Sequence, residues 1–217
     1  MRDIKLYISV PSCREWKPAF GSSFLGLTAH LMQKGVPGNN LKALFPEIAA
    51  QASCLSQARQ SSLTKAIQGQ FTHWLSLDDD MMFPPNVVDQ LLVHEKDVVT
   101  ANYRRKNAQK VLGVCMGLDG KIIDSTGKTG LEQIGWMGGG CFLADIEKIK
   151  HIPTPHFEVS WCPERQDYYD QDNYFSAKLR QNNCELWLDH DLSQQIVHVG
   201  DYPFAWPKED ALAMAAE

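Results

Sequence analysis

The stretch F-T-H-W-L-S-L-D-D-D-M-M-F-P-P, residues 71–85, joins a short apolar run to three consecutive aspartates. The apolar run at 74–77 and its abrupt polar end are typical of a buried central strand. Pro84 and Pro85 open the next segment, because proline fits the first turn of a helix. The aspartates therefore lie in the connection after a strand, which is where open α/β sheets place their ligand sites.

The carboxylates of Asp78, Asp79 and Asp80 repel one another, and a divalent cation is the usual way to hold such groups together. Asp78 and Asp80, two residues apart, can converge on one ion, or on the ion and a sugar hydroxyl. A solvated acidic turn is the alternative interpretation. It explains less well why the cluster follows the most apolar strand of the chain, so the pattern favours metal.

The bulk composition indicates one ordinary globular domain. The chain has 217 residues, of which 44% are hydrophobic and 22% charged, and its net charge is −5. This charge gives no broad footprint for nucleic acid, although a local basic patch would suffice. The sequence shows no signal-peptide pattern, no membrane-length apolar run and no C-x-x-C pair among its six cysteines. We therefore expect a cytoplasmic protein with reduced thiols and no membrane anchor.

Strand and helix patterns alternate along the chain and predict an α/β fold. A strand at 4–10 followed by a helix at 19–34 is typical of the opening of a nucleotide-binding half-sheet, and a strand at 41–45 and an amphipathic helix at 53–67 follow. Beyond the acidic turn the patterns predict a helix at 86–94, a strand at 97–101, a hairpin of 111–118 and 121–124, a helix at 168–182, strands at 185–188 and 195–199, and a turn at 189–191. An Ala-rich tail from Lys208 onward is expected to be loose or to dock as a helix.

Three further stretches carry candidate ligand groups. Arg59 and Lys65 lie on the polar face of the helix at 53–67 and are available to a ligand. The basic run 103–107 follows a predicted strand, where it can meet phosphate. The glycines at 138–140, inside an apolar stretch, indicate close approach of the backbone to a ligand or a neighbouring strand. A tight bend without a ligand explains the glycines equally well.

Six short motifs occur in the order found in GT-A glycosyltransferases, and the chain resembles especially the small bacterial and phage enzymes related to glycosyltransferase family 2. The motifs are I-S-V-P-S at 8–12, S-Q-A-R-Q at 56–60, W-L-S-L-D-D-D-M at 74–81, G-G-G-C-F-L at 138–143, Y-D-Q-D-N-Y-F at 169–175 and L-D-H-D-L-S-Q-Q-I-V-H-V-G at 188–200. The resemblance spans nearly the whole chain. It implies a single GT-A (Rossmann-like) α/β domain over 1–217, with a mixed, mostly parallel central sheet flanked by helices. Residues 1–102 would form the nucleotide-binding half and 103–217 the acceptor-binding half.

The resemblance also implies which residues bind the donor. The donor would be a nucleotide-sugar, with a UDP-sugar as the first expectation, and the cofactor would be Mn²⁺ or Mg²⁺. Asp78 and Asp80 correspond to the family's Asp-x-Asp motif, and His198 corresponds to a third metal ligand supplied by a late strand. The nucleotide would be lined by Pro11, Ser12, Arg59, Asp78 and Asp79.

On the acceptor side the resemblance implies a general base at Asp172. The preceding residue is Gln171, where the family has Glu, so Asp170 is the candidate substitute for the missing acid. Gly138, Gly139 and Gly140 would lie beside the donor sugar and the acceptor. The tryptophans Trp136, Trp161 and Trp206 are candidates for stacking on sugar rings or bases.

These residues predict a metal-dependent sugar transfer to a hydroxyl acceptor, with inversion if Asp172 removes the acceptor's proton. A retaining mechanism stays open if no carboxylate reaches the acceptor. The sequence does not identify the acceptor, and the lack of a membrane anchor favours a soluble glycan or another macromolecule over a lipid-linked acceptor. A hydroxymethylated base in phage DNA is one option, in which case Arg104, Arg105 and Lys106 would contact phosphate and a phage-encoded enzyme would act in the host cytoplasm. The net negative charge counts against DNA.

Two other classes of protein remain as alternatives. A nucleotidyltransferase shares the nucleotide-binding half, but it usually carries a glycine-rich basic loop after the first strand. Residues 11–18 read P-S-C-R-E-W-K-P and contain no glycine. A non-catalytic nucleotide-sugar-binding module is the second alternative, which the glutamine at 171 keeps open.

Overall fold

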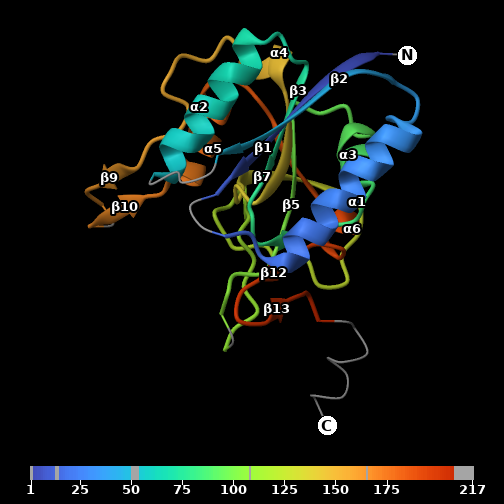
Figure 1. Ribbon diagram of the computed structural model, residues 1–217. Helices are drawn as coiled ribbons and strands as arrows, with labels where there is room; N and C mark the ends of the chain where they lie inside the picture. The colour runs from blue at the N-terminus through green and yellow to red at the C-terminus, as the bar shows by residue number, and fades with distance from the viewer. Residues whose placement is uncertain (1, 13–14, 50–53, 108, 165, 208–217) are drawn as a thin grey trace.

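The computed structural model describes residues 2–12, 15–49, 54–107, 109–164 and 166–207 and shows a central sheet with helices on both faces (Figure 1). The helices are α1 (Pro18–Lys34), α2 (Leu55–Gln68), α3 (Val87–Leu92), α4 (Ile146–Ile149), α5 (Gln171–Gln181) and α6 (His190–Ser193). The strands are β1 (Asp3–Pro11), β2 (Asn40–Ala49), β3 (His73–Leu77), β4 (Met81–Met82), β5 (Val98–Ala101), β6 (Met116–Gly117), β7 (Leu131–Trp136), β8 (Cys141–Asp145), β9 (Ser160–Cys162), β10 (Asp167–Tyr169), β11 (Leu186–Asp189), β12 (Val197–Val199) and β13 (Pro203–Phe204).

The main sheet has eight strands in the order β2-β1-β3-β8-β5-β11-β7-β6. Strand β1 pairs in parallel with β2 and β3, and β11 pairs in parallel with β5. Strand β8 runs antiparallel to both of its neighbours, and β7 runs antiparallel to β11 and β6. All strands except β7 and β8 therefore point the same way. The predicted single α/β domain with a mixed, mostly parallel sheet is confirmed.

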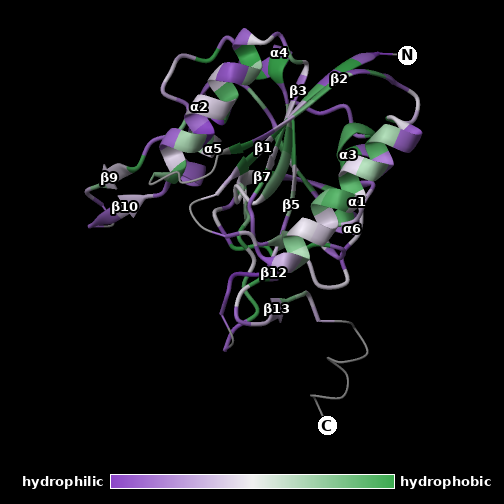
Figure 2. Cartoon of the chain, viewed as in Figure 1, coloured by the Kyte–Doolittle hydropathy of each residue, from purple (hydrophilic) through white to green (hydrophobic). Residues whose placement is uncertain are grey.

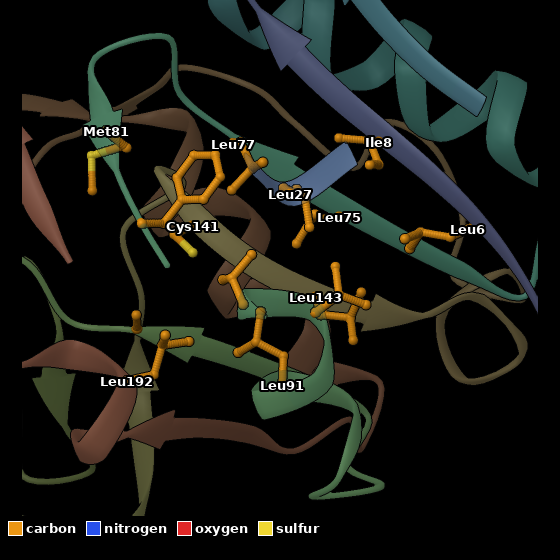
Figure 3. Packing of buried hydrophobic residues seen from close by; sticks show 14 of the residues in the cluster. Leu6, Ile8, Leu27, Leu75, Leu77, Met81, Leu91, Cys141, Leu143 and Leu192 are labelled. Atoms are coloured by element: carbon orange, nitrogen blue, oxygen red, sulfur yellow. The ribbon is translucent and has the colours of Figure 1, made fainter. Parts of the chain in front are cut away.

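Each face of the sheet is covered because the facing helices carry apolar side chains at helical spacing. Helix α1 buries Phe20, Phe24, Leu27 and Leu31, and it shares one core cluster with α3 and the strands β1 and β3. Figure 3 shows this packing, with Leu27 and Leu91 close to the strand side chains. Helices α2, α4 and α5 enclose a second cluster on the opposite face. In Figure 2 the hydrophobic colour accordingly follows the central strands and the inner sides of the helices.

Two features bring distant polar residues to one edge of the sheet. Parallel strands end at the same edge, so the connections after β1, β3 and β5 lie near each other and near the glycines that precede β8. A second sheet, β13-β12-β4, continues from the acidic turn because β4 follows it directly. Its register places His198 opposite Met81, one residue after Asp80.

Most predicted elements are present, but the hairpin is much shorter than the sequence pattern indicated. Strand β6 pairs with β7, and the two arms of the hairpin are joined by the isolated bridge between Met116 and Ile122, around a turn in which Gly120 has φ +78°. The cause is the buried Asn102 side chain. Its Oδ1 accepts from the backbone N–H groups of Val114 and Cys115, and its Nδ2 donates to the Ile123 carbonyl and Ser125 Oγ. These backbone groups are therefore held by a side chain in place of a strand.

Asn102→Ala is expected to lower the free energy of unfolding by about 3 kcal/mol, because it leaves buried backbone groups of Cys115 and Ile123 without their partner. Urea denaturation measures this loss. Asn40→Ala is the matched control, since the Asn40 side chain makes one exposed hydrogen bond, to Asp3, and should cost less than about 1 kcal/mol. Equal losses in the two variants would contradict the assigned role of Asn102.

Two predicted boundaries were wrong for reasons of helix capping. The helix predicted from 168 begins only at Gln171, because Asp170 caps it by accepting from the Asn173 N–H, and residues 167–169 pair with β9. The predicted turn at 189–191 is the start of α6, which Asp189 caps through the Leu192 N–H. The Ala-rich tail from Lys208 lies outside the described residues. No helix in the described part of the chain has the length and apolarity needed to cross a bilayer.

Candidate active site

The acidic turn after β3 gives each of its three carboxylates a different partner. Asp78 Oδ1 accepts from Arg59 Nη2 at 2.6 Å. Asp79 Oδ2 accepts from Ser12 Oγ at 2.6 Å, and Asp80 Oδ2 accepts from Lys106 Nζ at 2.5 Å. The three groups therefore point to three different neighbours.

Arg59 connects the acidic turn to a carboxylate on another element at this edge of the sheet. Its side chain comes from α2, is 0% exposed, and bridges two carboxylates that are 94 positions apart in the sequence, Asp78 and Asp172. Burial would lower the pKa of Arg59, but Asp172 and Asp78 outweigh burial and raise it. The surface arginine expected from the helical pattern is thus a buried one, while Lys65 on the same helix pairs with Glu47 near the surface.

The glycine run is packed against side chains. An added Cβ on Gly139 would lie 2.4 Å from the Arg59 guanidinium carbon, and one on Gly140 would lie 2.7 Å from the ring of Tyr103. Tyr103 Oη also accepts from the Gly140 N–H at 2.9 Å. The close backbone approach predicted for this run is therefore present, and its partners in the structure are two side chains of the site itself.

Asp172 lies in the first turn of α5, where both of its oxygens are held. Oδ1 accepts from Arg59 Nη1 at 2.5 Å and Oδ2 from the Gly139 N–H at 2.9 Å. Burial raises the pKa of Asp172 to about 6, although Arg59 acts in the opposite direction. The side chain remains 24% exposed. A carboxylate held in place, partly accessible and with a raised pKa is suited to proton transfer near neutral pH.

A cleft of about 580 Å³ opens at Asp172. Asp170, Asn173, Arg105 and Tyr103 line its polar side. The apolar side is made by residues around the shortened hairpin and before the glycine run, namely Val114, Met116, Ile122 and Met137. The cleft is large enough for a sugar-sized molecule beside the carboxylate.

Asp80 and His198 form a second, separate pair. His198 Nε2 lies 3.6 Å from Asp80 Oδ1, which is buried and without a hydrogen-bond partner among the described residues. His198 Nδ1 lies 2.9 Å from the Arg104 carbonyl oxygen, which can only accept, so Nδ1 carries the hydrogen. Burial would raise the pKa of Asp80, but His198 and Lys106 outweigh it and lower it. Within the described residues, no three or more His, Cys, Asp or Glu side chains form a group that could hold a metal.

The remaining predicted residues have varied positions. Pro11 and Ser12 are buried at the end of β1. The Arg180 guanidinium carbon lies 4.9 Å from the centroid of the Trp136 ring. Trp136 is not among the residues that line the cleft at Asp172. Trp161 is exposed on the β9–β10 hairpin, whereas Trp206 is buried and donates to the Asn102 carbonyl, so Trp206 is a core residue.

The basic run does not form one phosphate-binding strip. Arg104 donates to the Ala205 carbonyl, Arg105 donates to the Gly113 carbonyl, and Lys106 pairs with Asp80. The sequence interpretation missed the contact of Lys106 with the acidic turn and the packing of Tyr103 on the glycines. The available signal was their position directly after β5, at the same edge of the sheet as the aspartates.

This arrangement of sheet, acidic turn and flanking helices is the GT-A fold that the sequence motifs implied. Two solved structures share it at low sequence identity. The structure of A197 from STIV aligns with a TM-score of 0.59 and 15% identity, over 91% of this chain and 87% of that chain. The structure of GalNAc-T7 with UDP, GalNAc and Mn²⁺ aligns with a TM-score of 0.57 and 13% identity, over 91% of this chain but 44% of that chain. No protein-family model matches the chain, and no curated protein matches it.

Proposed function

We propose that the chain is a metal-dependent glycosyltransferase that moves a sugar from a nucleotide-sugar to a hydroxyl acceptor with inversion. The observation that carries this proposal is the Asp78–Arg59–Asp172 chain of contacts. It joins the acidic turn after β3 to a partly accessible carboxylate at the mouth of a sugar-sized cleft. The GT-A fold and the GalNAc-T7 structure, solved with UDP, GalNAc and Mn²⁺, support the choice of donor and cation.

The residues present fit a divalent cation. A carboxylate oxygen suits either Mn²⁺ or Mg²⁺, and such ions are commonly held by one or two side chains together with substrate phosphates. The imidazole nitrogen favours Mn²⁺, because Mg²⁺ takes oxygen ligands. Within the described part of the chain Asp80 Oδ1 has no hydrogen-bond partner, and His198 faces it with the nitrogen that a metal would use, since Nδ1 bonds to a backbone carbonyl. Asp80 and His198 would hold the ion, with Asp78 on the same turn. When bound, the ion would neutralise the charge that develops on the departing diphosphate.

Asp172 is the proposed general base. As the acceptor oxygen forms its bond to the anomeric carbon, the bond from that carbon to the diphosphate breaks and the hydroxyl proton passes to Asp172. Arg59 and the Gly139 N–H fix the orientation of the carboxylate, and positioned general bases contribute about 10²–10⁴-fold in rate. Attack from the side opposite the leaving group gives inversion.

Binding of the donor is tested by thermal shift. A nucleoside diphosphate or nucleotide-sugar of the correct base, at about 100 times its Kd, should raise the Tm by about 5–10 °C with Mn²⁺ and much less with EDTA. The metal-dependent rise should be lost in Asp80→Ala. A panel of UDP, GDP, ADP and CDP and their sugars identifies the base.

Asp119→Ala is the matched control for this measurement. Asp119 is an exposed acid that pairs with Lys121 in the turn of the short hairpin, so its loss should leave the shift unchanged. If no nucleotide shifts the wild type under any metal condition, the proposed donor site is wrong.

A further inference from the structure

Lys106 occupies a position that the glycosyl-transfer chemistry described above does not use. Its ammonium lies 2.5 Å from Asp80 Oδ2, while the other oxygen of the same carboxylate faces His198 Nε2 at 3.6 Å. That separation is too long for a hydrogen bond. Lys106 thus neutralises Asp80 on one side, while the other oxygen of the carboxylate faces the histidine nitrogen.

The aliphatic part of the Lys106 side chain packs against the turn between β12 and β13. An added Cβ on Gly200 would lie 3.3 Å from Lys106 Cδ and 2.9 Å from the ring of Phe204, so the absence of a side chain at position 200 leaves room for the lysine. The Lys106 side chain is still 36% exposed. Its ammonium is therefore directed toward the acidic turn, on a four-carbon stem that is flexible in lysine and here keeps a solvent-facing side.

We propose that Lys106 is a counter-ion that pairs with Asp80 before the donor binds. When the donor binds, the Lys106 side chain moves and its ammonium pairs with the donor's diphosphate. This inference rests on the proposed function. Metal arriving alone must compete with the ammonium for Asp80, since both are cations at one carboxylate. Metal arriving with a nucleoside diphosphate brings the anion that receives the displaced ammonium. Lys106 therefore makes metal and diphosphate bind cooperatively, and by linkage each tightens the other by the same factor.

The test measures Mn²⁺ binding directly, by the loss of the free Mn²⁺ signal in electron paramagnetic resonance, with and without saturating UDP or whichever nucleoside diphosphate the thermal shift selects. Lys106→Met removes the charge but keeps an unbranched stem. Without nucleotide, this variant is expected to bind Mn²⁺ about tenfold more tightly than the wild type. The factor by which the nucleotide tightens Mn²⁺ binding should fall by about tenfold or more.

Two further variants sharpen the comparison. Lys121→Met removes a lysine–aspartate pair of comparable chemistry, at the exposed Asp119, and should leave both Mn²⁺ constants unchanged. Lys106→Arg keeps a cation at the site and should retain the cooperativity. A Lys106→Met protein that binds Mn²⁺ alone no more tightly than the wild type would overturn the inference.

The same titration separates this inference from the proposed function. If the wild type binds Mn²⁺ and the nucleotide cooperatively but Lys106→Met behaves identically, only the role of Lys106 is wrong. If the wild type binds no Mn²⁺ even with each nucleotide of the panel present, the donor site and the inference are both wrong.

Discussion

An Asp172→Asn variant is expected to keep its fold and its donor affinity and to lose about 10²–10⁴-fold of the transfer rate. The amide cannot accept a proton at neutral pH. Its single oxygen can also serve only one of the two donors that Asp172 satisfies, Arg59 and the Gly139 N–H, so about 1–3 kcal/mol of stability should be lost as well. The measurement is kcat for release of the nucleoside diphosphate, with circular dichroism and the thermal shift confirming the fold and donor binding.

The pH profile of the wild type gives the same prediction a second readout. The carboxylate must be ionised to act as a base, and burial raises the pKa of Asp172 to about 6. Below that pH the group is protonated, so log kcat/KM should rise with unit slope up to about pH 6 and level off above it. The rise should be absent from the residual activity of Asp172→Asn.

Asp170→Asn distinguishes the two acidic candidates. Asparagine caps helices as well as aspartate does, so this variant keeps the bond to the Asn173 N–H and the start of α5. If Asp172 is the base, Asp170→Asn should lose much less rate than Asp172→Asn. The reverse order would move the base to Asp170. A protein that binds the donor but shows no turnover in the wild type would be a binding module.

Arg59→Met is expected to have the largest effect on stability. It leaves Asp78 and Asp172 without the buried cation that bridges them, and breaking such a pair by removing one partner typically costs about 3–5 kcal/mol. The pKa of Asp172 should rise further, because Arg59 is the group that opposes the effect of burial. Urea denaturation measures the first effect, and an upward shift of the pH profile in the folded fraction measures the second.

Lys65→Met on the same helix is the matched control, since its partner Glu47 lies near the surface and exposed pairs contribute about 0–1 kcal/mol. The Arg59→Met/Asp172→Asn double variant should be more stable than the sum of the two single losses predicts, because it removes both a charge and its partner. Strict additivity would mean that the two side chains do not interact in solution.

Local sequence rules predicted much of the fold. Apolar periodicity identified α1 and β3, because it depends on residues near one another in the chain. The fold class followed from the resemblance carried by six motifs in order along nearly the whole chain. The extent of the hairpin was not predictable in this way. It depends on the Asn102 side chain, which forms hydrogen bonds with backbone groups 12 to 21 positions further along the chain.

The candidate site also has features that local sequence rules predict and features that they do not. The acidic turn could be predicted because its three carboxylates are consecutive and follow an apolar strand. The bridging role of Arg59 could not, because the helical pattern gave no indication that this arginine turns inward to carboxylates 19 and 113 positions away. The contact between Lys106 and Asp80 likewise depends on the placement of two separate loops at one sheet edge.

The packing of the glycine run has a consequence for engineering acceptor specificity. Positions 138–140 are closed to diversification, because any β-carbon there would come within 2.4–2.7 Å of Tyr103, Val114 or Arg59. Met116 and Ile122 line the same cleft from the short hairpin, where they are partly or largely exposed. A combinatorial library that varies these two positions, and leaves the glycines untouched, would reshape the side of the cleft that we propose receives the acceptor, without altering Arg59, Tyr103 or Asp172.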